Sequence, residues 1–94
     1  MESLEITYSH NPFEYPEYPH IVKLRVIFDR LGSEETIVTV VRGHRYLGQK
    51  LKEAETWLYQ HGFDYKLTMK PNSSTRDLYF KTKTDAMMFK LGWV

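Results

Sequence analysis

A change of hydrophobic period along the chain constrains its fold more than any other feature. Val22, Leu24, Val26 and Phe28 are apolar at every second position, and the charged residues Lys23 and Arg25 stand between the first three. This period of two indicates a half-buried β-strand. Between Arg45 and His61 the spacing becomes helical, with one stripe formed by Leu47, Leu51, Ala54 and Leu58,. Gly62 follows at a common helix end. The sequence therefore predicts a domain that combines strands with helices.

A second strand is predicted immediately after the first. The stretch TIVTVV (Thr36–Val41) is dominated by β-branched residues, which favour strands,. Leu31–Glu35 lies between the two segments and contains Gly32 and Ser33, which are typical of a turn,. Because Thr36–Val41 is apolar on both faces, we expect it to be central in the sheet or covered on its second face.

The C-terminal half repeats this order of elements. Alternating apolar residues predict a third strand at Phe63, Tyr65, Leu67 and Met69,. Pro71–Arg76 is a polar turn, and Leu78 with Phe80 indicates a fourth strand. Thr84 is a candidate N-cap for a short helix that ends at Gly92,.

These elements predict a single α+β domain over residues 21–94, preceded by an N-terminal arm over residues 1–20. The expected architecture is a four-stranded, mainly antiparallel sheet in ββαββα order, with both helices on one face. The arm is expected to be extended and irregular.

The arm is acidic and aromatic. Residues 1–20 carry four glutamates and no lysine or arginine, whereas the rest of the chain holds 13 basic against 8 acidic residues. The arm should therefore be attracted to the domain. We expect first that it is a strap, with Phe13, Tyr15 or Tyr18 over Val38, Val40 and Ile27. An arm that reaches a second copy, and a motif for another protein, remain as alternatives.

One face of the predicted sheet is rich in basic residues. If the helices cover the apolar face, the opposite face carries Lys23, Arg25, Lys66, Lys70, Tyr79 and Lys81. Single-stranded nucleic acid can bind such a face through its phosphates and by stacking a base on the ring. Solvated strands are also often rich in lysine, and this simpler interpretation is the one the sequence favours.

Exposed aromatic residues are the candidates for protein binding. Tyr46 and Trp57 lie beside the helical stripe, and Trp93 lies near the C-terminus. Tryptophan and tyrosine are enriched at interfaces, although they also fill core margins. The full set of interface candidates is Phe13, Tyr15, Tyr18, Tyr46, Trp57 and Trp93.

Other kinds of site have weaker support in the sequence. The segment VRGHRY (Val41–Tyr46) is expected to be a strand-to-helix loop, in which Arg42, His44 and Arg45 could hold an anion,. A polar loop that caps the helix is the alternative. The spacing from His10 to His20 matches no rigid metal-ligand frame, and no nucleophile and base are suitably paired. We expect no metal site, no cofactor, no small-molecule substrate and no catalytic activity.

The length and composition of the chain limit the class of protein and its expected location. The 94 residues suit one small domain, and there is no cysteine,. No apolar run in the sequence is long enough for a membrane span,. A cytoplasmic protein without membrane contact is the expectation.

The stretch YFKTKTDAMMFKLGW (Tyr79–Trp93) resembles the closing strand and helix of small uncharacterised proteins of tailed bacteriophages. The resemblance implies a small accessory or host-directed binding protein in a bacterial cytoplasm, and it assigns no site residue. Together with the aromatic candidates, it leads us to expect a non-catalytic protein that binds a protein partner or a second copy of itself. Nucleic-acid binding through the basic face is the alternative.

Overall fold

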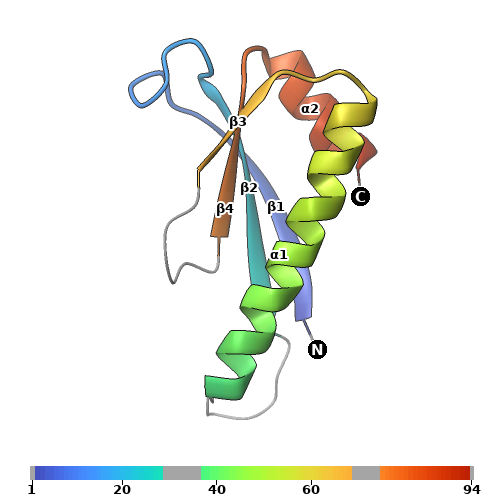
Figure 1. The fold of residues 1–94 in the computed structure, drawn as a ribbon. Coiled ribbons are helices and arrows are strands. Elements are labelled where there is room, and N and C mark those ends of the chain that lie inside the picture. Colours follow the sequence, from blue (N-terminus) through green and yellow to red (C-terminus); the bar gives the residue numbers. More distant parts are fainter. Residues whose placement is uncertain (1, 29–36, 69–74, 94) are drawn as a thin grey trace.

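The computed structural model describes residues 2–28, 37–68 and 75–93, which form a sheet and two helices in ββαββα order (Figure 1). The elements are β1 (Glu2–His10), β2 (His20–Phe28), α1 (Ile37–Gln60), β3 (Tyr65–Thr68), β4 (Thr75–Phe80) and α2 (Lys83–Gly92). The α+β fold class expected from the sequence is confirmed. The predicted turn Leu31–Glu35 lies outside the described residues, as do Met69, Lys70 and the start of the turn at Pro71.

The sheet has four strands in the order β1-β2-β4-β3, and each neighbouring pair is antiparallel. Strands β2 and β4 form the centre, where His20 lies opposite Phe80. Strand β1 pairs with β2 over its whole length, from Glu2 opposite Phe28 to His10 opposite His20. Strands β1 and β3 are therefore the two edges.

The prediction of a strand at Thr36–Val41 is wrong, because Ile37–Val41 form the start of the long helix α1. Thr36 itself lies outside the described residues. β-Branched residues are only mildly unfavourable in helices, and tertiary context readily overrides that preference. In sequence, Ile37 and Val40 also continue the helical spacing that leads to Leu47.

Strand β1 takes the place that the sequence assigned to Thr36–Val41. The N-terminal segment is extended as expected, but Glu2–His10 is a regular strand and the irregular part is confined to residues 11–19. Leu4, Ile6 and Tyr8 alternate along β1 and pack against the core. We call residues 11–19 the β1–β2 connection.

The core lies between the sheet and the two helices, which cover one face of it (Figure 1). From the sheet it contains Val22, Leu24, Val26, Leu78 and Phe80, and from the helices Leu47, Leu51, Ala54, Leu58, Ala86 and Phe89. This confirms the predicted helical stripe and the inward face of β2. Each large apolar side chain buried here contributes about 1.5 to 3 kcal/mol.

Helix α2 begins two residues earlier than the sequence suggested. Thr82, rather than Thr84, is the N-cap, and its Oγ1 accepts a hydrogen bond from the Asp85 backbone N–H at 3.0 Å. The Asp85 carboxylate in the first turn and Lys90 in the last turn both suit the helix dipole,. This capped start fixes which side chains of α2 face the core and which face outward.

Candidate functional site

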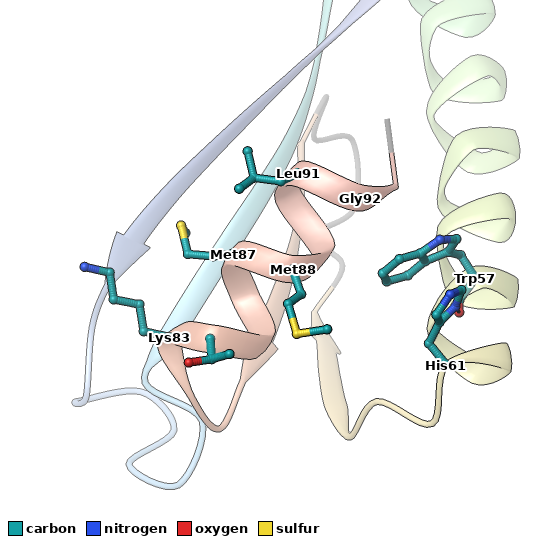
Figure 2. Close-up of a pocket in the computed structure, with 8 residues that line it drawn as sticks. Trp57, His61, Lys83, Met87, Met88, Leu91 and Gly92 are labelled. Carbon is teal, nitrogen blue, oxygen red and sulfur yellow. Dashed lines mark hydrogen bonds between the residues drawn. The ribbon is translucent and has the colours of Figure 1, made fainter.

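An apolar groove lies between the end of α1 and helix α2 (Figure 2), with a volume of about 730 Å³. We call it the α1–α2 groove. It is lined by Trp57, His61, Lys83, Thr84, Met87, Met88, Leu91 and Gly92. Thioether, indole and alkyl groups make up most of this lining, so the groove suits an apolar ligand surface.

A stack of rings forms the α1 side of the groove. The imidazole of His61 lies on the indole of Trp57, with ring centres 4.1 Å apart, and Phe63 stacks on the same indole at 5.4 Å. His61 Nδ1 also lies 2.8 Å from the Trp57 carbonyl oxygen, which accepts a hydrogen bond when that nitrogen is protonated. These contacts hold the indole in one orientation.

Gly92 allows α2 to approach this stack closely. A Cβ atom at Gly92 would lie 3.2 Å from Trp57 Cζ2, which is tighter than nine in ten real Cβ contacts. On the inner side of α2, Phe89 lies 5.9 Å from Trp57 and 5.4 Å from the ring of Trp93. The indole is therefore part of the core margin and part of the groove at once.

Helix α2 exposes apolar side chains on the side that does not face the core. Leu91 is 78% exposed and Met88 is 52% exposed. Figure 2 shows Met88 pointing towards Trp57 and His61 across the groove. Among the described residues, the ionisable members of the lining are Lys83 and His61, and neither is acidic. The groove is thus mainly apolar, and the Lys83 ammonium lies on its β1 side, 5.9 Å from the ring centre of Tyr8.

The opposite face of the sheet is partly covered by the β1–β2 connection. Tyr79 on β4 is only 2% exposed, and the ring of Tyr15 packs against it edge-on at 4.8 Å. The Tyr79 hydroxyl donates a hydrogen bond of 3.0 Å to Glu14. Burial and this hydrogen bond raise the pKa of Tyr79 to about 12. The acidic connection therefore straps its own sheet, as expected, with Tyr15 over Tyr79. Val38 and Val40, which were predicted to lie in the sheet beneath it, belong to α1.

Basic residues hold the rest of the connection. Lys66 Nζ lies 5.4 Å from the ring centres of both Tyr15 and Tyr18. The Tyr18 hydroxyl donates to Asp64, whose carboxylate also pairs with Lys81 at 2.8 Å. The hydrogen bond from Lys81 lowers the pKa of the Asp64 carboxyl. Tyr15 and Tyr18 thus attach the connection to the domain within one chain.

The nucleic-acid candidates are only partly brought together. Lys23, Arg25 and Lys66 are exposed on the outer face, and Arg25 Nη1 lies 3.9 Å from Glu5. Because Tyr79 is buried under the connection, it offers no ring face for a base,. Lys81 lies after the end of β4, and Lys70 lies outside the described residues.

The interface candidates divide among three places. Phe13, Tyr15 and Tyr18 belong to the β1–β2 connection, where Phe13 is 91% exposed and the other two contact the sheet. Of the helical candidates, Trp57 lines the α1–α2 groove, whereas Tyr46 packs at the core margin with Lys50 Nζ 5.7 Å above its ring. The third place is beside β1, where Trp93 lines a small cavity together with Leu4 and Ile6.

The predicted anion loop does not exist. Arg42, His44 and Arg45 lie within α1, so no helix start is beside them to provide backbone N–H groups,. Arg45 is exposed, and the side chains of the other two lie outside the described part of the chain. The loop prediction failed for the same reason as the strand Thr36–Val41, because both lie inside one continuous helix.

Met87, Met88, Leu91, His61 and Gly92 of the groove were missed from the sequence. A signal was present, because α2 is too apolar for a helix with one buried face. Ala86 and Phe89 are buried and Met87 packs at the core margin, which leaves Met88 and Leu91 on the outward sides,. The partnership with Trp57 depends on tertiary packing and had no local signal.

Comparison with family models, with curated proteins and with solved structures gives no match for this chain. Neither helix of the described residues has both the length and the apolar character to cross a membrane. Within residues 2–28, 37–68 and 75–93, no three histidine, aspartate or glutamate side chains gather as a metal site would require.

Proposed function

We propose that this protein is a non-catalytic binding protein and that its α1–α2 groove receives a protein partner. The observation that carries this proposal is the exposure of Met88 and Leu91 beside the Trp57 stack. Large apolar side chains that remain exposed around a concave apolar surface are typical of interaction sites. Methionine adapts its shape to a partner at low cost, and tryptophan is enriched among residues that dominate binding energy.

The partner that fits this groove is an apolar peptide segment that carries a carboxylate. The apolar lining would receive side chains at helical spacing,. The acidic group would pair with Lys83 on the β1 side of the groove, where its ammonium lies 5.9 Å from the ring centre of Tyr8. The resemblance of Tyr79–Trp93 to phage proteins would make this partner a protein of the bacterial host, in its cytoplasm.

Nucleic-acid binding is the alternative, and exposed Lys23 and Arg25 are the residues that favour it. Two contacts weigh against it. Lys66 and Lys81 are engaged by tyrosines and Asp64 of the same chain, and the acidic Glu14 lies over the same face. Any polyanion would have to compete with these internal contacts.

The test is selection from a library of displayed peptides that present apolar residues at helical spacing together with an acidic residue. We expect selected peptides to bind the full chain and to lose affinity by about tenfold or more for Leu91→Glu, since the charge would enter an apolar contact. Met88→Glu should act in the same way. Tyr59→Glu is the matched control, because Tyr59 is 86% exposed on α1 and does not line the groove.

Peptides that bind wild type and Leu91→Glu equally would show that the groove is not the site. A library that yields no binder would contradict the proposal as well. The proposal would also be contradicted if Tyr59→Glu and Leu91→Glu lowered the affinity for the peptides equally. Binding would then depend on exposed apolar area in general.

A further inference from the structure

We propose that the free edge of β1 pairs with β1 of a second copy, so that two sheets join into one continuous antiparallel sheet. This surface is distinct from the α1–α2 groove. Strand β1 is nine residues long, and among the described residues β2 is the one strand that pairs with it. An edge of this length presents a row of backbone groups that can template a further strand.

The hydrogen-bond pattern shows which residues carry these free groups. The Asn11 backbone N–H donates to the Pro19 carbonyl at 2.8 Å, and this pair continues the β1–β2 register by one position. Because hydrogen-bonded pairs alternate in antiparallel sheets, the odd-numbered residues of β1 bond to β2. The N–H and C=O groups of Leu4, Ile6 and Tyr8 therefore point to the free edge.

The usual protections of an edge strand are weak in β1. It contains no proline, lysine or arginine, and its register with β2 runs through nine consecutive pairs without a bulge,. Its one central charge, Glu5, lies 3.9 Å from Arg25 of the same sheet. The opposite edge, β3, is only four residues long and carries Lys66. Strand β1 is thus the edge that remains available.

The sequence of β1 is complementary to itself, and this selects a second copy as the occupant. An antiparallel pairing centred on Ile6 places Ile6 opposite Ile6, Leu4 opposite Tyr8 and Glu5 opposite Thr7. The same register places Ser3 opposite Ser9 and Glu2 opposite His10, so apolar meets apolar and no like charges meet. It uses the full strand and keeps the helices of both copies on one side. Centring on Glu5 would oppose two glutamates, and centring on Thr7 would shorten the overlap.

Apolar surface beside the edge supports the same occupant. Leu4, Ile6 and Tyr8 are only partly buried, whereas the inward residues of β2 are fully covered. Leu4 and Ile6 line a cavity of about 190 Å³ together with Trp93, Lys50 and Glu53. A second β1 would extend the apolar face at this point. The exposed edge and the partly exposed apolar residues would then be covered by one contact.

The test measures solution mass by light scattering and by sedimentation, from about 1 µM to about 1 mM, which spans the range of weak interfaces. We expect the mass to rise from the 11.3 kDa of one chain towards twice that value. Thr7 is exposed, lies opposite Lys23 within the chain and would face Glu5 of the second copy. Thr7→Glu should weaken the dimer, and Thr7→Lys should strengthen it, each by about 2- to 30-fold for two cross-strand pairs.

These two substitutions have opposite effects inside one chain, since a glutamate would attract Lys23 and a lysine would repel it. Weakening of the dimer by Thr7→Glu therefore cannot arise from loss of folding. A protein that stays monomeric at all concentrations would overturn the proposal. The proposal would also fail if Thr7→Glu and Thr7→Lys did not change the dimer affinity in opposite directions.

Amide hydrogen exchange gives an independent measurement. We expect the amides of Leu4, Ile6 and Tyr8 to become protected as the concentration rises. The amides of Glu5 and Thr7, which bond to β2, should be protected throughout. Exchange at Ile6 that is as fast at high concentration as at low concentration would also overturn the proposal.

Discussion

Tyr79 on β4 donates a hydrogen bond of 3.0 Å to the carboxylate of Glu14, a residue 65 positions earlier in the chain. This bond ties the β1–β2 connection to the outer face of the sheet, where the ring of Tyr15 also rests on Tyr79. The acidic, proline-rich segment is therefore a cover for its own sheet. Its contacts make the stability of the protein sensitive to the protonation of a buried tyrosine.

We expect stability to fall in alkaline solution. The pKa of Tyr79 is raised from 10 to about 12, firstly by burial. The folded state therefore binds this proton more tightly than the unfolded state, so the stabilisation is complete below about pH 10 and is lost as the pH rises towards 12. The contribution is about 2 to 3 kcal/mol. Urea unfolding at several alkaline pH values measures it, and Tyr79→Phe should show a smaller loss than wild type.

Tyr65 adds to the same trend, because burial and a hydrogen bond to Glu55 raise its pKa to about 12 as well. Tyr59→Phe is the control, since Tyr59 is 86% exposed. If Tyr79→Phe and Tyr59→Phe lose stability with the same pH profile, then Tyr79 has no special role in alkaline unfolding.

Two glycines of the helices should respond in opposite directions to alanine. Gly48 lies within α1 with no atom near its missing Cβ, so Gly48→Ala should stabilise the protein by about 0.5 to 1 kcal/mol,. Gly92→Ala places a Cβ 3.2 Å from Trp57 Cζ2, and the stacked indole has little room to move. We expect a net loss of about 1 kcal/mol, as is typical of mild overpacking. Thermal and urea unfolding of both variants measure this difference, and a stabilised Gly92→Ala would contradict the packing described here.

Mild acid should also reduce stability, through His20. Burial, followed by the charges of His10 and Lys83, lowers the pKa of His20, whose Nδ1 lies 2.8 Å from the Tyr8 hydroxyl. The unfolded chain then binds this proton more tightly, so the stabilisation is complete above about pH 6.5 and is lost as the pH falls below that value. His20→Gln should flatten the dependence of the unfolding free energy between about pH 5 and pH 8. A His20→Gln variant that keeps the wild-type slope would contradict this role of His20.

Titration with single-stranded RNA tests the nucleic-acid alternative directly. Because Tyr79 is covered and Lys66 is engaged by Tyr15 and Tyr18, we expect no specific binding at moderate salt. Fluorescence anisotropy at two salt concentrations provides the measurement. Binding that weakens steeply with salt and is abolished by Lys66→Glu would instead favour the basic face as the functional surface.

Local patterns predicted most of the core. The alternation at Val22, Leu24 and Val26 and the helical stripe from Leu47 to Leu58 both specify buried faces, and the structure buries them. The order ββαββα was also correct. One of its strands, however, was assigned to the wrong segment. Strand β1 shows the same alternation, at Leu4, Ile6 and Tyr8, but the prolines that follow it made the whole N-terminus resemble an arm.

The segment Ile37–Val41 shows why composition alone misled. Its β-branched residues favour a strand locally, but the difference in helix propensity is a few tenths of a kcal/mol per residue, less than the gain from continuing a packed helix. The α1–α2 groove could not be predicted from local sequence patterns, for a different reason. Trp57 and Gly92 meet only because two helices cross the same sheet, and no pattern within either helix encodes that contact.

The central pairing of β2 with β4 also affects when the chain can fold during its synthesis. His20 must find Phe80, so the middle of the sheet closes only after most of the chain has left the ribosome,. Until then β1 and β2 can form no more than an isolated hairpin, which is marginal in water, and α1 has no complete surface to cover. The sheet and its apolar cover are therefore expected to be completed only after the last hairpin and α2 have emerged.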